Sequence, residues 1–378
     1  MTDLVEDAGG GDGVASSLLE EKYRKQMRQI HPQKIELPIS TLQAMIKEQI
    51  TLNPEFQRRD RWDNKKRSRF VESIIMNVPI PPVFLGEDEY GTYVVLDGRQ
   101  RLTAIHEFLK NSFALEGLTV WDELNGQRYA DLEKSGLNRT LTRRFVPAIL
   151  LLKESSPEVK YDVFDRLNTG GVKANEMEIR NAVFRGKFTA LLHEVSKIAN
   201  FRKLWGIPEG GKDLDENTIF STMDDVEYVL RFFALRDTSA IEGRFKDYLS
   251  LFMKSRNEAY AADASLKDSD DALFRRTIET TYKVFGDAAF MRTSPSDGKS
   301  RRSAPLADAV LFSMSFVDAQ KLVDGDNEKI HAAFNALLAD KDFAAAISSG
   351  TNGKGAITQR TGAAKKAVLA AVPHAGMA

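Results

Sequence analysis

One short segment concentrates residue types that bind phosphate groups. An apolar run at 93–96 leads into a carboxylate, a glycine, two guanidiniums and an amide, namely Asp97, Gly98, Arg99, Gln100 and Arg101. Further on, apolar residues recur at the spacing of one helix face, at positions 102, 105, 108 and 109. The segment therefore predicts a strand, a tight turn and a helix. The polar residues would lie at the N-terminus of that helix, where free backbone N–H groups and the helix dipole favour an anion.

Two interpretations of this segment remain open. In the first, it is a phosphate site in which Asp97 faces a metal ion or a water molecule. In the second, it is a polar first turn of a helix that only contacts solvent. We prefer the phosphate site, because two arginines and a carboxylate within five residues are a poor choice for a simple turn.

Composition sets limits on the class of protein. The chain has 378 residues, enough for two domains, and its 42% hydrophobic and 28% charged residues are ordinary for a soluble globular protein. A net charge of −1 means that any contact with nucleic acid must come from a local patch. The absence of cysteine excludes disulfides, thiolate nucleophiles and cysteine-bound zinc. No run approaches the ~18–20 apolar residues of a membrane helix and no signal peptide is recognisable, so we expect a cytoplasmic protein with no membrane partner.

Patterning along the chain predicts three regions. An acidic, glycine-rich leader at 1–33 is expected to be disordered or weakly ordered, because it cannot bury enough apolar surface. An α/β domain follows at 34–155 and a helical domain at 156–378. The expected elements of the α/β domain are strands at 35–39, 83–85, 93–96 and 145–152, a helix capped by Ser40-Thr41 and a helix at 64–76. The strand at 145–152 is almost wholly apolar, which predicts burial on both faces.

A second polar segment precedes the helix at 64–76. Its sequence at 54–62, Pro-Glu-Phe-Gln-Arg-Arg-Asp-Arg-Trp, contains Gln57 and Arg58, which we expect to converge on the same pocket as Arg101. Basic residues continue from there into the helix, at Arg59, Arg61, Lys65, Lys66 and Arg67. These five residues either contact DNA or form a solvated helix face.

A third segment opens the helical region. The turn Asn168-Thr169-Gly170-Gly171 precedes Asn175-Glu176-Met177-Glu178-Ile179-Arg180-Asn181. The two glycines allow close approach of a ligand to the backbone, and Asn175 with Glu178 has the spacing of a capping box. Asn168, Gly170 and Gly171 either support a nucleotide pocket or only end a helix at a domain junction. Arg180 and Asn181 are weaker site candidates.

These three segments, in this order, resemble the signatures of GmrSD-type restriction N-terminal domains. The Asp-Gly-Gln-Gln-Arg motif of that family reads Asp-Gly-Arg-Gln-Arg here, so that Arg99 stands where the family usually has glutamine. The resemblance covers about residues 35 to 250. It implies an α+β fold, with a ParB/sulfiredoxin-like small mixed sheet and helices at the N-terminus and an all-helical domain at the C-terminus.

The resemblance also implies a function. It predicts a nucleotide-binding module of a prokaryotic phage-defence system that hydrolyses a nucleoside triphosphate, with Asp97 and Arg101 as catalytic residues. Arg58 and Arg101 would hold phosphates, Gln57 and Gln100 would make polar contacts, and Asp97 would orient Mg²⁺ or water. The partners would be a nucleotide, DNA and a separate nuclease or defence-system subunit.

Other functional classes are less well supported. Related systems often carry a His-Asn-His nuclease domain, but the five histidines here are scattered and none has the spacing of a metal-ligand pair. The segment Gly353-Lys354-Gly355 lacks the spacing of a phosphate-binding loop. The main alternative is a DNA-binding adaptor without turnover, supported by the stretch 57–69, whose seven basic and two acidic residues give a local charge of +5.

Overall fold

A computed structural model describes residues 32–52, 62–88, 91–155, 160, 161, 163, 166, 175–293 and 298–376. The chain forms two compact units, of which the first comprises residues up to Thr51 and Ser68–Leu167, and the second comprises Leu52–Arg67 and Asn168–Ala378. The predicted leader at 1–33 lies almost wholly outside the described residues, and the predicted domain boundaries stay a prediction.

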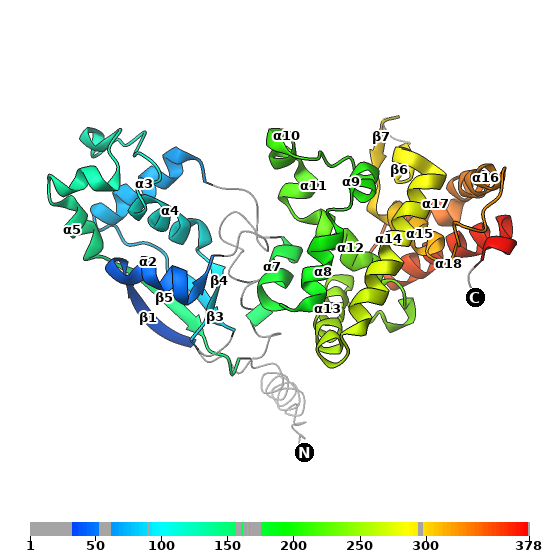
Figure 1. Cartoon of the computed structure of the whole chain (residues 1–378), viewed down its shortest axis with the longest axis horizontal. Helices are drawn as coiled ribbons and strands as arrows, with labels where there is room; N and C mark the ends of the chain where they lie inside the picture. The colour runs from blue at the N-terminus through cyan, green and yellow to red at the C-terminus, as the bar shows by residue number, and fades with distance from the viewer. Residues whose placement is uncertain are drawn as a thin grey trace, which may run out of the picture. The chain divides into compact units, whose positions relative to one another are not determined.

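The first unit is built on a five-stranded mixed sheet in the order β1-β5-β3-β4-β2 (Figure 1). Its strands are β1 (Pro32–Pro38), β2 (Ile50–Thr51), β3 (Val83–Glu87), β4 (Tyr93–Asp97) and β5 (Phe145–Leu151). The β1/β5 and β3/β4 pairs are antiparallel, whereas β3/β5 and β2/β4 are parallel. The mixed sheet confirms the predicted fold class for this unit.

Helices and loops complete the first unit. The helices are α2 (Ile39–Glu48), α3 (Asn64–Ile75), α4 (Arg99–Leu109) and α5 (Leu137–Thr142), with 3₁₀ turns at Asp122–Leu124 and Tyr129–Glu133. The core side chains of β4 and α4, among them Val95, Leu102 and Phe108, are fully buried. The strand and helix on either side of Asp97-Gly98 are therefore fixed in place by packing.

Two details of the first unit differ from the sequence prediction. Helix α2 begins at Ile39 with Pro38 as its N-cap, and no side chain caps it, so the predicted Ser40-Thr41 cap is wrong. Thr41 instead donates its hydroxyl to the Pro38 carbonyl at 3.1 Å. Strand β5 alternates between buried and more exposed positions, and Phe145 is 52% exposed, so burial on both faces holds only in part.

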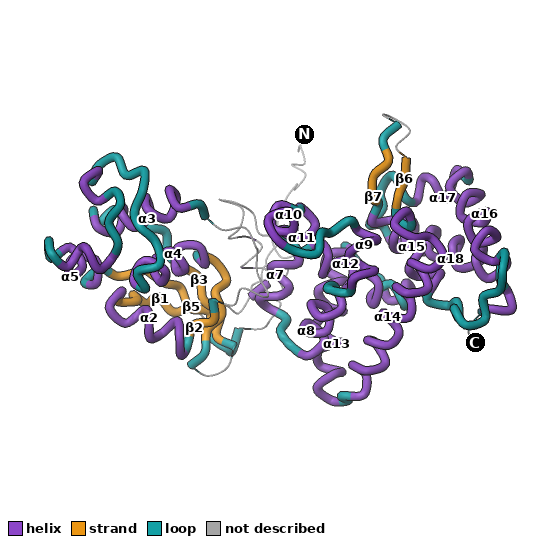
Figure 2. The backbone as a smooth tube through the Cα atoms, turned by 45° about the horizontal axis from the view of Figure 1, so that its top comes forward, coloured by secondary structure: helices purple, strands orange, loops and turns teal. Residues whose placement is uncertain are grey.

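The second unit is mainly helical (Figures 1 and 2), as predicted. Its helices are α7 (Glu176–Val183), α8 (Lys187–Val195), α9 (Ala199–Trp205), α10 (Gly211–Glu216), α11 (Thr218–Ser221), α12 (Asp224–Ala234), α13 (Phe245–Ala262), α14 (Ser265–Phe285), α15 (Ala304–Met314), α16 (Asp326–Ala339), α17 (Lys341–Ala346) and α18 (Lys354–Ala371). A cluster of phenylalanines, including Phe188, Phe201 and Phe274, fills its core. Within the described residues, no helix is long and apolar enough to cross a membrane.

A short β-hairpin interrupts the helices and was not predicted. Strands β6 (Met291–Thr293) and β7 (Ser300–Arg302) pair antiparallel, and Arg292 lies opposite Arg301 (Figure 2). Arg302 donates from Nε to the Leu204 carbonyl at the end of α9, at 2.7 Å. Arg292 donates from Nη1 to the Ile347 carbonyl just after α17, at 3.0 Å. The two arginines thus fasten the base of the hairpin to two helix C-termini.

A buried ionic triad joins three helices of the same unit. Asp308 of α15 accepts from Arg231 of α12 at 2.6 Å and from Arg360 of α18 at 2.6 Å. Arg360 is fully buried, and the other two residues are less than 9% exposed. One carboxylate therefore serves two guanidiniums in the interior of this unit.

Candidate functional site

The turn between β4 and α4 requires a glycine. Gly98 has φ +90° and is the N-cap of α4. A Cβ atom on Gly98 would lie 2.5 Å from Cγ1 of Val83 on the neighbouring strand β3. Backbone conformation and close packing together exclude a side chain here, so the chain can turn directly from the strand into the helix.

Asp97 and Arg101 form an ion pair across this turn. Nη2 of Arg101 lies 2.6 Å from Oδ2 of Asp97, and the side chains are 12% and 37% exposed, respectively. Arg101 also donates from Nη1 to the carbonyls of Pro81 and Pro82, the latter at 3.2 Å. Burial lowers the pKa of the Arg101 guanidinium, while the charge of Asp97 and its hydrogen bond oppose that shift. Arg101 therefore ties the carboxylate of Asp97 to the proline-rich segment before β3.

The first turn of α4 offers backbone donors beside this ion pair. The first N–H that bonds back along the helix is that of Leu102, which donates to the Gly98 carbonyl at 3.0 Å. The N–H groups at the start of a helix have no partner within the helix, and the helix dipole makes their end positive. Arg99 and Gln100 stand in this turn, and both are half-buried. Asp97, Gly98, Arg99, Gln100 and Arg101 thus lie together at one helix terminus, as the sequence predicted.

Asp97 fits the predicted magnesium ion only as a single carboxylate ligand. Magnesium is commonly held by one or two carboxylates, the phosphates of the substrate and water. Oδ2 of Asp97 contacts Arg101, which leaves Oδ1 as the atom that would bind the ion. Among the described residues, no group of three or more histidine, aspartate or glutamate side chains is placed to hold a metal.

The basic residues of the second segment are only partly described. Gln57, Arg58, Arg59 and Arg61 lie outside the described residues. Lys65, Lys66 and Arg67 occupy the first turn of α3, where Oδ1 of Asp63 accepts from the Lys66 N–H at 2.7 Å. Lys65 and Lys66 are exposed, whereas Arg67 is half-buried and donates to Asn64 at 3.1 Å. Lys65 and Lys66 are therefore the cations of this segment that are open to a ligand.

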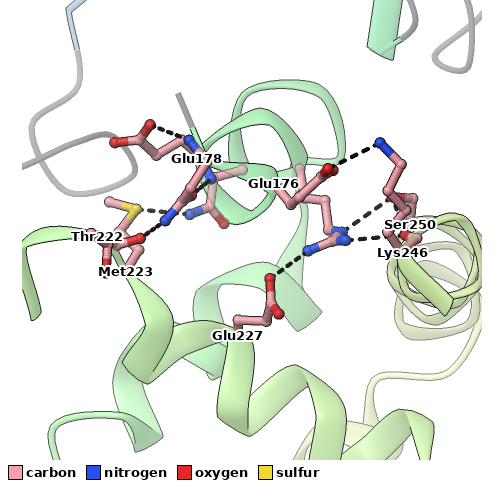
Figure 3. Close-up of polar contacts among 10 residues, drawn as sticks. Glu176, Glu178, Thr222, Met223, Glu227, Lys246 and Ser250 are labelled. Atoms are coloured by element: carbon pink, nitrogen blue, oxygen red, sulfur yellow. Dashed lines mark hydrogen bonds and ion pairs between the residues drawn. The ribbon is translucent and has the colours of Figure 1, made fainter. Parts of the chain in front are cut away.

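The turn of the third segment, with Asn168, Gly170 and Gly171, also lies outside the described residues. The helix after it confirms the predicted capping box, because the Glu178 N–H donates to Asn175 Oδ1 at 2.9 Å and the Asn175 N–H donates to Glu178 Oε2 at 2.9 Å. The Asn175 amide also donates to the Thr222 carbonyl just before α12 (Figure 3). This side chain thus links two helix starts.

Arg180 has a structural role in the described contacts. Its guanidinium donates to Ser250 Oγ at 3.1 Å, to Glu227 at 2.9 Å and to the Lys246 carbonyl at 3.0 Å (Figure 3). Its neighbour Asn181 is fully buried and contacts the sulfur of Met223 at 3.3 Å. Both side chains hold α7 against α12 and α13, and neither was a leading site candidate.

Two buried carboxylates support the first unit and were missed by sequence reasoning. Glu72 of α3 accepts from the N–H groups of Val120 and Trp121 at 3.2 and 2.9 Å. Glu87 at the end of β3 accepts from those of Gly91 and Lys153 at 3.3 and 3.1 Å. The available signal was an acidic residue at an apolar position of a helix or strand, which needs a hydrogen-bond donor when buried.

Comparison with known proteins identifies the first part of the chain. The family model described as the GmrSD restriction endonuclease N-terminal domain matches residues 39–185, which include the Asp97–Arg101 pair. Searches of curated proteins and of solved structures found no match. The family is that of a restriction-type defence system, whereas the likeness to ParB and sulfiredoxin stays a prediction. Residues 39–185 therefore belong to the family of GmrSD restriction endonuclease N-terminal domains.

Proposed function

We propose that the N-terminal domain binds a nucleoside triphosphate and hydrolyses it as part of a phage-defence system. The observation that carries this proposal is the carboxylate of Asp97, which Arg101 holds beside the positive N-terminus of α4. Phosphoryl transfer depends mainly on positioning and on stabilisation of negative charge. A helix terminus for the phosphates and a fixed carboxylate for the water supply both.

Each residue of the turn receives a role in this proposal. The backbone N–H groups of the first turn of α4, with Arg99 and Gln100, bind phosphate oxygens. Asp97 orients the attacking water, and bound Mg²⁺ would neutralise phosphate charge. The sequence suggested that Arg101 contacts phosphate directly. Its contacts with Asp97, Pro81 and Pro82 favour a positioning role, in which it fixes the direction of the Asp97 carboxylate.

The proposal is tested by an assay of hydrolysis of all four nucleoside triphosphates, with and without Mg²⁺ and duplex DNA. Asp97→Asn should leave nucleotide affinity within a few-fold and lower turnover about a hundredfold, the scale of a lost acid–base or positioning group. Arg101→Ala should mainly lower turnover if it positions Asp97. It should instead weaken nucleotide binding about ten- to a hundredfold if it contacts phosphate.

Lys110→Ala is the matched control, because it removes an exposed cation at the other end of α4. It should leave affinity and turnover unchanged. A folded Asp97→Asn variant with the turnover of the wild type would reject the catalytic role of this turn, because asparagine caps a helix about as well as aspartate. Absence of hydrolysis by the wild type under all conditions would reject the enzyme and leave the binding module.

A second candidate function is DNA binding through α3. The first turn of α3 contains Lys65, Lys66 and Arg67 and no acidic residue. Cations at a helix N-terminus are unfavourable because the dipole is positive there, and a DNA phosphate would offset that repulsion. DNA cleavage would then belong to a separate nuclease subunit.

A gel-shift titration with duplex DNA tests this candidate. Changing Lys65 and Lys66 to Glu should abolish a salt-sensitive shift and leave nucleotide binding intact. The same two-residue change at Lys212 and Lys341, both exposed in the second unit, is the charge-matched control. If wild-type protein gives no shift at ~50 mM salt, where binding driven by phosphate contacts is strong, DNA binding is excluded.

A further inference from the structure

A cluster of cations surrounds two aromatic side chains in the helical unit. Its members are Arg236 just after α12, Arg276 of α14 and Lys365 of α18. Nζ of Lys365 lies 3.6 Å from the centroid of the Phe316 ring, and Cζ of Arg236 lies 4.6 Å from the same centroid. Arg236 also lies 5.9 Å from the ring of Phe312. Phe316 and Phe312 are half-buried, so the cluster is open to solvent at one side.

The charges of this cluster are not neutralised within the described part of the chain. Arg236 donates to the hydroxyl of Ser315, which is a neutral acceptor. Arg236, Arg276 and Lys365 take part in none of the ion pairs found among the described residues. Burial lowers the pKa of Arg236, and the charge of Arg276 lowers it further, so these two guanidiniums are close enough to repel each other.

This arrangement is unusual for a surface that has only a structural role. Like charges held close together destabilise the folded state, and a half-buried guanidinium without an ionic partner adds a desolvation cost. The other inward-facing arginines of the same unit have acidic partners: Arg180 pairs with Glu227, Arg231 with Asp308 and Arg256 with Asp270. The cluster therefore lacks an anion that the remainder of the unit supplies internally.

The charge of the cluster indicates which anion it would take. A single carboxylate carries one negative charge, which one guanidinium satisfies. A phosphate group carries up to two charges and several acceptor oxygens, and arginine binds it with paired N–H donors. Three cations on three different helical elements suit the phosphate group better.

We propose that Arg236, Arg276 and Lys365 form a binding site for a phosphate group in the helical unit. This site is additional to the nucleotide site proposed at Asp97 and does not depend on it. The phosphate group comes either from free phosphate or from the backbone of a nucleic acid, and the two sources share the same chemistry at the three cations.

Thermal melting and calorimetric titration of the full chain test the site with inorganic phosphate. Phosphate should raise the melting temperature of the wild type above its value in chloride of equal ionic strength, because a ligand of the native state stabilises it. The variant with Arg276→Ala and Lys365→Met should bind phosphate at least about tenfold more weakly, the effect of losing a charge-assisted contact. In chloride, Arg276→Ala alone should melt at or above the wild-type temperature, because it relieves the repulsion on Arg236.

The control changes Lys212 and Arg244, one exposed lysine and one exposed arginine that pair with Glu216 and Asp247. It removes the same charge and should bind phosphate as the wild type does. Asp97→Asn is the second control and should also keep the phosphate effect, which separates this site from the nucleotide site.

A fluorescent 20-base-pair duplex distinguishes the two sources. If the cluster variant loses duplex affinity and phosphate competes with the duplex, the site takes a backbone phosphate. If duplex binding is unchanged while phosphate binding falls, the site takes free phosphate. Equal phosphate affinity of the wild type and the cluster variant overturns the proposal, and so does equal stabilisation of the wild type by glutamate, which would indicate an acidic protein partner.

Discussion

Asp224 is the residue whose ionisation most affects the helical unit. It is the first residue of α12 and is half-buried. Burial raises its pKa to about 6, the charges of Glu227 and Asp225 raise it further, and a hydrogen bond with Thr222 opposes the shift. A carboxyl whose pKa is raised on folding binds more protons in the native state than in the unfolded state. It therefore lowers stability as the pH rises from about 4 to about 6.

Asp224→Asn should remove this pH dependence. Relative to the wild type, the variant should gain about 2 kcal/mol in free energy of unfolding between pH 4 and pH 8, since one pKa unit is about 1.4 kcal/mol. Urea unfolding at the two pH values measures the difference. Asp268→Asn, at an exposed position in the first turn of α14, is the control and should show no such gain. An equal change for both variants would contradict the assignment to Asp224.

At this scale the sequence predicted neighbours along the chain and missed partners far from them. The four-residue spacing of Asp97 and Arg101 placed both at one helix terminus. The contacts of Arg101 with the Pro81 and Pro82 carbonyls cross about twenty residues, and no local pattern indicates them. The acidic residues of α12 read as an ordinary helix start, because their burial depends on packing in the folded unit.

Among the elements, the turn from β4 to α4 depends most on a single residue. Gly98→Ala should destabilise the chain by about 2–4 kcal/mol, the sum of a left-handed conformation and the clash with Val83. Gly91→Ala is the matched control, because Gly91 has φ +79° with nothing within 4 Å of the added Cβ. It should lose only about 1–2 kcal/mol. Chemical denaturation of both variants gives the clash term as the difference, and adding Val83→Ala to Gly98→Ala should recover part of it.

Local patterns predicted most elements of the first unit. Apolar runs marked β3, β4 and β5, and prolines at 79, 81 and 82 marked the end of α3. The start of α2 was wrong because Pro38 can precede a helix without a side-chain cap. The β6–β7 hairpin was missed, since its polar strands lack the alternation that marks a half-buried strand.

At the scale of the whole molecule, the buried triad tests how charge is balanced in the helical unit. Asp308→Asn leaves Arg231 and Arg360 without a counter-ion and should lower the free energy of unfolding by about 3–5 kcal/mol. Arg231→Met leaves one guanidinium with one carboxylate and should lose clearly less. Equilibrium unfolding in urea compares the two variants. A larger loss for Arg231→Met would show that its hydrogen bonds and its packing on Phe245 matter more than charge balance.

The hairpin has a consequence for folding kinetics. The contact of Arg302 with the Leu204 carbonyl closes a loop of 98 residues, and that of Arg292 with the Ile347 carbonyl closes one of 55. Each acceptor is the end of a helix, so both helices must be formed before the hairpin can attach. These contacts should therefore form after the rate-limiting step, because loops of this length are slow to close. Arg302→Ala should speed unfolding about fivefold and leave the refolding rate unchanged in stopped-flow measurements, so the hairpin would act as a kinetic latch on the helical unit.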